Sequence, residues 1–361
     1  MKILDRYMVT ELGGSFLFGL AAFTLIFVAG QLLNIARLVS EEHASLFAAA
    51  KYFVYTLPQT LVLTFPMSML LSVLLAMSRL SADSEITAMR AGGVSLYRIA
   101  APVVAIGLTA SIVALLFQEF VVPEATQRAT EILKREIQSG GVDILQNEVV
   151  RTVLPNQDSQ VTYAEGYDPA TQQLVQVSVQ LYRGEALTSL LVAPRASYRN
   201  SSWEFQNAVA YAMSPTCCLV SKYPLLDVDI GADPTQLLEL RKQPEDLSRA
   251  QIRPLMNNAK KNGDISRYAL LLVTYDSKLA RPFASLVFTL LAIPLGIRRQ
   301  RSSSGAGFGI SIAIVFAFYV VTTICLAIGR TTPELSFTMA WLPNVMFCAT
   351  GVWLLQLAAK V

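Results

Sequence analysis

The sequence predicts a membrane α-helical protein with six transmembrane helices and an inserted extracytoplasmic β domain of jelly-roll-like fold. Three observations lead to this prediction. Of the 361 residues, 53% are hydrophobic and only 15% are charged, whereas soluble domains carry about 25% charged residues. The apolar residues are concentrated in long runs near both ends of the chain. Between these runs, a polar middle contains segments in which apolar and polar residues alternate, which is typical of half-buried strands.

The long apolar runs are the predicted transmembrane helices. A helix needs about 20 mostly apolar residues to cross a bilayer, because its backbone polar groups must all be satisfied within the helix. Six runs meet this requirement, at residues 12–36, 52–77, 99–122, 279–297, 307–328 and 337–357. The first run is longer than the roughly 7–15-residue apolar core of a cleavable signal peptide, so we expect it to be retained as a span.

Basic residues near the ends of the spans predict the orientation of the chain. With the N-terminus inside, the short outer loops carry only Arg37, Lys51 and Arg330. The inner flanks carry three times as many basic residues, namely Lys2, Arg6, Arg79, Arg90, Arg98, Arg298, Arg299, Arg301 and Lys360. Inner loops are enriched in Lys and Arg in this way. Both termini are therefore predicted to be cytoplasmic, with residues 123–278 on the outer side of the membrane.

The outer segment is predicted to be a β-rich domain with flanking helices. A helical extension at residues 124–137 precedes the strands, and an amphipathic stretch at 265–278 leads into the fourth span. Two runs alternate clearly, with one face formed by Val175, Val177, Val179 and Leu181 in the first and by Trp203, Phe205, Val209 and Tyr211 in the second. Several such strands at short spacing favour a sandwich or jelly roll. The chain thus divides into residues 1–122, which include a cytoplasmic helix at 80–92, residues 123–278, and residues 279–361.

Catalytic and cofactor-binding patterns are missing from the sequence. The single histidine, His43, has no catalytic partner nearby, and no G-x-x-x-x-G-K-[ST] pattern for binding ATP is present. Gly305, Gly307 and Gly309 lie between two spans rather than after a strand, which favours a flexible turn over a phosphate site. The four cysteines have no paired spacing. We therefore expect neither an enzyme nor a bound cofactor or metal ion.

The distribution of charge excludes two further classes of function. The net charge of +3 reflects the position of basic residues around the membrane, and it does not indicate nucleic-acid binding. Ion-coupled transporters usually carry ionisable residues at mid-membrane depth, and the six apolar runs contain none in their interiors. An energy source outside the spans is therefore expected.

The loop between the second and third spans, residues 78–98, contains a short predicted helix. Ser81 or Asp83 is suited to cap its start, and acidic side chains suit the positive end of its dipole. Gly92 and Gly93 are suited to end it. Ile86 and Met89 lie three residues apart, so they are predicted to form an apolar ridge that projects beside the acidic groups. The loop is either a solvated connector or a docking helix for a cytoplasmic partner.

Five short segments resemble the lipopolysaccharide-export permease family LptF/LptG. They are LDRY at residues 4–7, SEITAMRAGG at 84–93, YDSKLARP at 275–282, AIPLG at 292–296 and WLPN at 341–344. The resemblance covers nearly the whole chain, in the same order and on the same topology. It implies that the helix at 80–92 is the coupling helix of this family.

The resemblance also implies the partners and the site residues. Two such chains pair, as a heterodimer or a homodimer, and an LptB-like ABC ATPase binds their coupling helices. Lipopolysaccharide is extracted from the inner membrane and passed to periplasmic LptC/LptA-like β proteins; no nucleic acid is involved. The residues assigned to ATPase coupling are Glu85, Asp83, Ile86, Met89 and Arg90. Those assigned to the lipid, near the outer end of span one, are Arg37, Asn34 and Gln31.

Two alternatives remain, of which the first belongs to another class of protein. One is a membrane-anchored envelope sensor whose β domain binds a ligand. The other is an ion-coupled transporter, which the empty span interiors disfavour. Co-purification separates them, because a permease carries an ATPase whereas a sensor carries a signalling partner or none.

Overall fold

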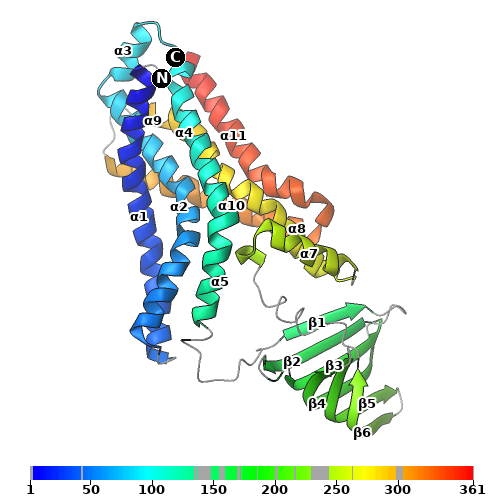
Figure 1. Cartoon of the computed structure of the whole chain (residues 1–361). Helices are drawn as coiled ribbons and strands as arrows, with labels where there is room; N and C mark the ends of the chain where they lie inside the picture. Colours follow the sequence, from blue (N-terminus) through cyan, green and yellow to red (C-terminus); the bar gives the residue numbers. More distant parts are fainter. Residues whose placement is uncertain are drawn as a thin grey trace. The chain divides into compact units, whose positions relative to one another are not determined.

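The computed structural model describes residues 3–41, 44–133, 136, 148–153, 159–168, 171, 173–184, 186–199, 202–214, 217–228, 244–261, 263–297 and 304–360 (Figure 1). His43 lies outside this set. The chain folds into two compact units. The helical unit comprises Met1–Leu133, Ser248–Ile252 and Ala269–Val361, and the β unit comprises Lys134–Leu247 and Arg253–Tyr268.

The described residues contain six helical segments that are long and apolar enough to span a membrane. These segments are Ile3–Ser40, Leu46–Ala82, Leu96–Ile132, Ile265–Ile297, Gly309–Thr331 and Pro333–Lys360. The predicted number and order of the spans are confirmed, but most helices extend well beyond the apolar runs. A helix of 37 residues such as Leu96–Ile132 is about 55 Å long at 1.5 Å per residue. It is therefore longer than the hydrocarbon core, which is about 30 Å thick.

The third segment is continuous through a local change of helix type. It consists of α4 (Leu96–Leu116), the π-helical turn η1 (Phe117–Val121) and α5 (Val122–Ile132). Pro123 lies at the start of α5, where a missing backbone N–H costs little because the first N–H groups of a helix have no partner within it. The predicted helical extension at 124–137 is thus part of the third helix up to Ile132.

The fourth segment is interrupted near its middle. It consists of α8 (Ile265–Ala280), the 3-10 turn η4 (Arg281–Phe283) and α9 (Ala284–Ile297). Pro282 interrupts the helical hydrogen bonding, and Asn344 of α11 (Ser336–Lys360) donates a 2.7 Å hydrogen bond from Nδ2 to the Ala280 carbonyl beside the break. Because the helix begins at Ile265 rather than 279, it contains Asp276 and the buried Lys278. Both residues precede the predicted apolar run at 279–297, so the expectation that the interiors of the six runs carry no ionisable side chain stays a prediction.

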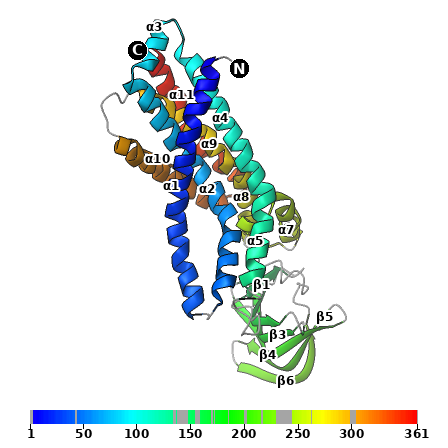
Figure 2. The same cartoon turned by 60° about the vertical axis from the view of Figure 1, so that its left-hand side comes forward.

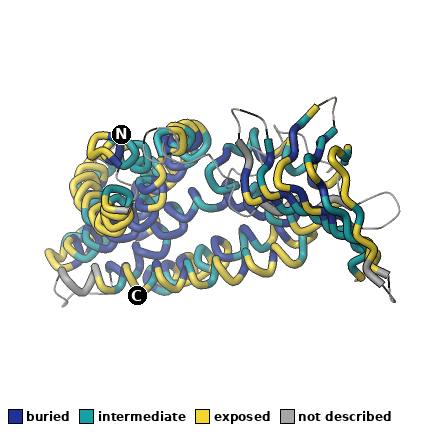
Figure 3. Tube along the Cα trace, turned by 90° about the horizontal axis from the view of Figure 1, so that it is seen from below, coloured by how far each residue is buried: buried dark blue, intermediate teal, exposed yellow. Residues whose placement is uncertain are grey.

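The core of the helical unit lies between α2 (Leu46–Ala82) and α9. Three glycines bring neighbouring helices close, because a Cβ at Gly107, Gly296 or Gly351 would come within 3 Å of an atom of the facing helix. In contrast, α1 (Ile3–Glu41) and α10 (Ser304–Thr331) expose many apolar side chains. Exposed positions along the chain are coloured yellow in Figure 3. Both chain termini lie at the end of this unit where α3 is found (Figures 1 and 2).

The β unit contains one six-stranded antiparallel sheet. Its strands are β1 (Glu148–Val153), β2 (Ser159–Asp168), β3 (Gln173–Arg183), β4 (Ala186–Arg199), β5 (Ser202–Ser214) and β6 (Cys217–Val228). The predicted inserted β domain is confirmed. Its described strands follow one another as a meander, which is a simpler order than the Greek-key crossovers of a full jelly roll. The core lies on one face of the sheet and includes Trp203 and Phe205.

The alternation of buried and exposed residues shifts by one position within β3 and β5. Gln176 and Asn207 have φ values of 50° and 53°, in the left-handed region. As a result Leu174, Val177 and Val179 are buried in β3, and Val175 is only half-buried. In β5 the buried residue after the shift is Ala208 rather than Val209. The predicted faces are thus right for Val177, Val179, Trp203 and Phe205 and wrong for Val175 and Val209, because simple alternation ignores a left-handed residue.

Prolines occupy the same level of the neighbouring strands. The pairs Val177–Ala193 and Val175–Arg195 place Gln176 opposite Pro194. In the same way, the pairs Gln206–Leu225 and Ala208–Tyr223 place Asn207 opposite Pro224. A proline inside a central strand is tolerated only where the ladder of hydrogen bonds is already broken. We call this row, Gln176, Pro194, Asn207 and Pro224, the bend line of the sheet.

Candidate functional site

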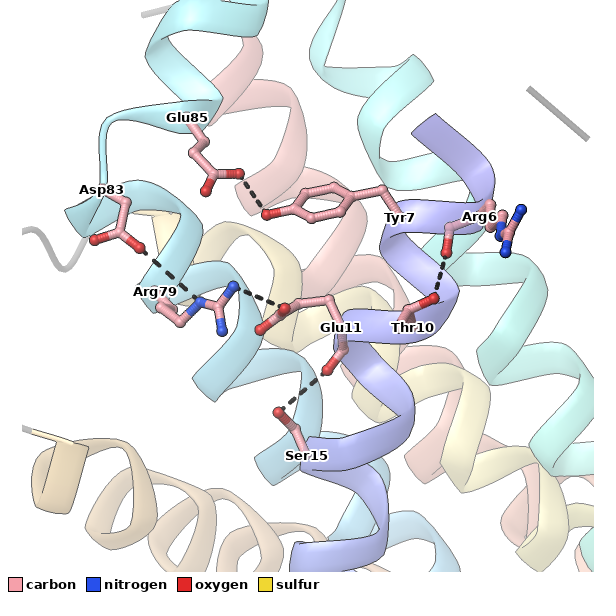
Figure 4. Close-up of polar contacts among 8 residues, drawn as sticks. All are labelled: Arg6, Tyr7, Thr10, Glu11, Ser15, Arg79, Asp83 and Glu85. Carbon is pink, nitrogen blue, oxygen red and sulfur yellow. Dashed lines mark hydrogen bonds and ion pairs between the residues drawn. The ribbon is translucent and has the colours of Figure 1, made fainter. Parts of the chain in front are cut away.

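The candidate site lies around α3 (Glu85–Ala91), a short helix between α2 and α4. It is found at the same end of the helical unit as the N-terminal turns of α1 (Figures 1 and 2). The neighbouring polar side chains come from α1 and from the last turns of α2 (Figure 4).

The start of α3 is not capped as the sequence predicts. Ser84 is the N-cap residue, with a left-handed φ of 59° and no hydrogen bond from its side chain. Ser81 instead donates a 2.8 Å hydrogen bond from Oγ to the Ile297 carbonyl at the end of α9. Asp83 ends α2 and forms an ion pair of 3.9 Å with Arg79. Ser81 therefore ties α2 to α9, Asp83 pairs within the end of α2, and α3 begins without a side-chain cap.

The end of α3 agrees with the prediction. Gly92 is the C-cap residue, and Gly93 follows it with φ of 84°. The backbone N–H of Gly93 donates to the Arg90 carbonyl at 2.9 Å, and that of Val94 donates to the Met89 carbonyl at 3.0 Å. This pair of bonds is a Schellman motif, for which glycine is favoured at the left-handed position. The helix therefore has a fixed end.

The apolar ridge of α3 faces the bundle and not the surroundings. Ile86 is only 3% exposed and belongs to the core of the helical unit, and Met89 packs against that core. The prediction that these two side chains project outward is wrong. Their physical role is to anchor a short helix that is marginal in isolation. The outer face of α3 carries small exposed side chains, namely Ser84, Thr87, Ala88 and Ala91.

Polar contacts join the first turns of α1 to the helices around it (Figure 4). The Tyr7 hydroxyl donates a 2.7 Å hydrogen bond to Oε2 of Glu85. One turn further along α1, Glu11 forms an ion pair with Arg79 of α2, with 2.8 Å between Oε2 and Nη2. A second ion pair, of 2.7 Å, joins Arg98 of α4 to Asp5 of α1. Glu85 is half-buried, so part of its carboxylate remains accessible.

Sequence reasoning identified Glu85 and missed its partner Tyr7 and the ion pair of Glu11 with Arg79. A signal was present, since Asp5 and Tyr7 belong to the LDRY segment that resembles the family. The antiparallel order of the first two spans also places the start of α1 beside the end of α2. Arg90, in the last turn of α3, is half-buried, at the end of the helix dipole that favours a cation.

The predicted lipid-contact residues divide into two groups. The side chain of Gln31 bonds to another helix of the same unit, because its Nε2 donates a 2.7 Å hydrogen bond to Oγ1 of Thr60 in α2. Thr56 also donates to Gln31 Oε1, at 3.4 Å. Asn34 and Arg37, which lie three residues apart on α1, are exposed. Only the latter two are placed to contact a ligand outside the helical unit.

Comparison with known proteins identifies the family. The model of the lipopolysaccharide export system permease family LptF/LptG matches residues 6–357. The chain belongs to this family. It is also similar to the lipopolysaccharide export system permease protein LptG of Haemophilus influenzae, with 23% identity over 373 residues that cover 99% of each chain. The chain is therefore a transporter subunit and a multi-pass protein of the inner membrane, as the resemblance in its sequence implied.

Proposed function

We propose that this chain is one permease half of an ATP-driven exporter. It extracts lipopolysaccharide, or a related glycolipid, from the inner membrane and passes it to a periplasmic bridge of β proteins. The observation that carries the proposal is the match of the permease family over residues 6–357. The six long apolar helices and the inserted sheet agree with that match.

A separate LptB-like ATPase supplies the energy in this proposal, because the sequence has no ATP-binding P-loop pattern. The termini and α3 are then cytoplasmic, and residues 123–278 are periplasmic, in agreement with the positive-inside distribution. The small side chains on the outer face of α3 allow a partner surface to approach the backbone closely. Asp83 and Glu85 add negative charge at the start of α3, which favours a basic partner residue.

Arg37 is the proposed contact for a lipid phosphate, with Asn34 beside it. Both side chains are exposed on α1, and a guanidinium forms strong, charge-assisted hydrogen bonds with phosphate oxygens. Gln31 positions this part of α1 against α2 through its bond to Thr60. The contact with lipid is therefore assigned to the outer face of α1.

Two further protein partners belong to the proposal. A second LptF/LptG-type chain, identical or different, would cover the exposed apolar faces of α1 and α10. A periplasmic LptC/LptA-like protein would pair with the open edge of the sheet. The edge strand β6 exposes Leu219, Val220, Tyr223 and Leu225, and exposed strand edges recruit further strands through main-chain hydrogen bonds.

Replacement of Glu85 tests the proposal. Losing one member of a charged pair at an interface costs about 2–5 kcal/mol, which is roughly 30- to 5,000-fold in affinity. Glu85→Ala and the charge-reversed Glu85→Arg are therefore expected to lose the co-purifying ATPase and the lipid-stimulated hydrolysis of ATP. Glu124→Ala is the matched control. Glu124 is an exposed glutamate that also has a partner, Arg128, but both residues belong to α5 and not to α3.

The same experiment separates the proposal from its alternative. A membrane-anchored sensor would purify without an ATPase, and its β domain would bind an envelope ligand in the absence of ATP. Normal ATPase binding and normal stimulation in both Glu85 variants would show that α3 is a solvated connector.

A further inference from the structure

The contact between Tyr7 and Glu85 joins two residues that are 78 positions apart in the chain. The hydroxyl engages only one oxygen of the carboxylate, Oε2. Among the described residues, no hydrogen bond or ion pair engages Oε1. An ionised carboxylate can accept several hydrogen bonds through its two oxygens. Glu85 can therefore keep its bond to Tyr7 and still accept a cation from another protein.

Glu85 needs such support because α3 provides little of its own. The helix has seven residues and starts at Ser84 without a side-chain cap. Ile86 fixes one face of α3 in the core, but a glutamate has three rotatable side-chain bonds, and its carboxylate loses rotamer freedom whenever it is held. A hydrogen bond from a rigid aromatic residue restricts that freedom before any partner arrives.

Tyr7 is itself well placed to act as a support. Glu11, four residues later on the same face of α1, pairs with Arg79 of α2, and Asp5 pairs with Arg98 of α4. These two ion pairs hold the start of α1 on both sides of Tyr7. The tyrosine hydroxyl therefore has a defined position relative to α3 (Figure 4).

We infer that Tyr7 is a positioning residue, which holds the Glu85 carboxylate with Oε1 turned toward the basic residue of a docking ATPase. The inference rests on the proposed function, since it assigns the partner of α3 to an ATPase. Pre-ordering the carboxylate raises affinity, because the cost of ordering the side chain falls on folding and not on binding.

The alternative is that the Tyr7–Glu85 hydrogen bond acts as a latch, which competes with docking instead of supporting it. In that case, the basic residue of the partner would displace Tyr7 from Glu85, and the bond would weaken docking. The two relations predict opposite signs for the removal of the hydroxyl, so a single substitution separates them.

The test uses Tyr7→Phe, which removes the hydroxyl and keeps the ring. Binding of the purified ATPase to the full-length chain in detergent is expected to weaken roughly 2- to 10-fold, because the Glu85 side chain must then be ordered on binding. The KM for ATP of the complex at saturating chain is expected to stay unchanged, because Tyr7 does not act on the nucleotide. Tyr97→Phe is the matched control, since Tyr97 is 53% exposed in α4 at the same end of the bundle.

A double-mutant cycle shows whether Tyr7 acts through Glu85. In a Glu85→Gln background, Tyr7→Phe is expected to add much less than its effect in the parent chain. Full additivity, unchanged binding or tighter binding in Tyr7→Phe would each overturn the inference, and tighter binding would establish the latch. If Glu85→Ala also binds the ATPase normally, the proposed docking of the ATPase on Glu85 fails; if only Tyr7→Phe does, the inference alone fails. Equal melting temperatures of Tyr7→Phe and Tyr97→Phe exclude a folding defect.

Discussion

The inner and outer helices of the bundle differ sharply although both are strongly apolar. In the most apolar 18-residue window of Leu46–Ala82, 78% of the residues are buried, whereas in that of Ile3–Ser40 only 11% are buried. Hydropathy thus identifies both helices as spans but does not distinguish a helix that other helices surround from one that faces outward. In a bilayer, lipid covers apolar surface as well as protein does, so close packing decides the difference.

Glycines show the same contrast at the level of single atoms. Gly351 of α11 lies against the backbone of α9, where an added Cβ would be 2.9 Å from the Leu291 nitrogen. At Gly14, Gly30 and Gly309, in α1 and α10, such a Cβ would meet no atom of a neighbouring helix within 4 Å in the part of the chain that the structure describes. The inner glycines are therefore required by the fold of one chain. Gly14, Gly30 and Gly309 are available for contacts with a second chain or with lipid, unlike Gly19 and Gly329 of the same helices, which lie close to Ser68 and Val273.

The largest expected effect is that of a large side chain at an inner glycine. Gly351→Leu forces α11 away from the backbone of α9, and such overpacking costs about 3 kcal/mol or more. The chain is expected to melt at a clearly lower temperature in detergent, or to be lost from the membrane. Gly14→Leu, in the open part of α1, is the matched control and should leave the melting temperature of the single chain nearly unchanged. Equal losses in both variants would contradict the division into inner and outer helices.

A somewhat smaller effect is expected from Asn344→Leu. This substitution keeps the size of the side chain and removes the hydrogen bond to the Ala280 carbonyl beside the break at η4. A buried carbonyl without a partner costs about 1–3 kcal/mol. Asn34→Leu, at an exposed position of α1, is the control. Thermal unfolding of both variants provides the comparison, and an unchanged Asn344→Leu would show that another group satisfies the carbonyl.

A smaller effect is expected where an outer helix meets an inner one. Gln31→Leu removes the bonds between α1 and both Thr56 and Thr60 of α2. The contact is only partly buried, so the expected loss of stability is about 0.5–1.5 kcal/mol. Cysteine crosslinking between the outer ends of α1 and α2 should become less efficient. A loss of stability as large as that of Asn344→Leu would show that this part of α1 packs as tightly as the inner helices do.

The smallest effect on stability is expected for Arg37→Ala, because its side chain is exposed. Photo-crosslinking of glycolipid to α1 should nevertheless become weaker if Arg37 binds a phosphate. Arg330→Ala serves as a control for the loss of one positive charge at another helix end. Unchanged crosslinking and export in Arg37→Ala would leave Arg37 as an interfacial side chain without a role in the lipid path.

The sequence predicted those features that depend on local pattern. The six spans follow from apolar runs, and the end of α3 follows from Gly92 and from Gly93, which has the left-handed conformation that glycine favours. The orientation of Ile86 was not predictable in this way, because a ridge on a two-turn helix can face inward or outward equally well. The Tyr7–Glu85 bond depends on packing between segments 78 residues apart, for which local periodicity carries no information.

The faces of the strands illustrate a second limit. Period-two alternation is correct for Trp203 and Phe205, which precede the left-handed Asn207, and it fails for Val209, which follows it. A left-handed asparagine or glutamine inside a strand has no clear signature in a single sequence. The prolines at 194 and 224 were the available hint, since a proline inside a strand points to an interrupted ladder.

The bend line also bears on how the sheet avoids indiscriminate association. An edge strand as long and apolar as β6 is a hazard for aggregation, because it offers unpaired backbone groups to any extended chain. Pro224 removes one donor from the middle of β6 and divides the edge into two short stretches. A generic strand can pair along only one of them at a time, whereas a partner with an interruption at the same level can pair along both. The proline therefore acts as a gatekeeper, which favours a partner strand interrupted at the same level over a generic extended chain.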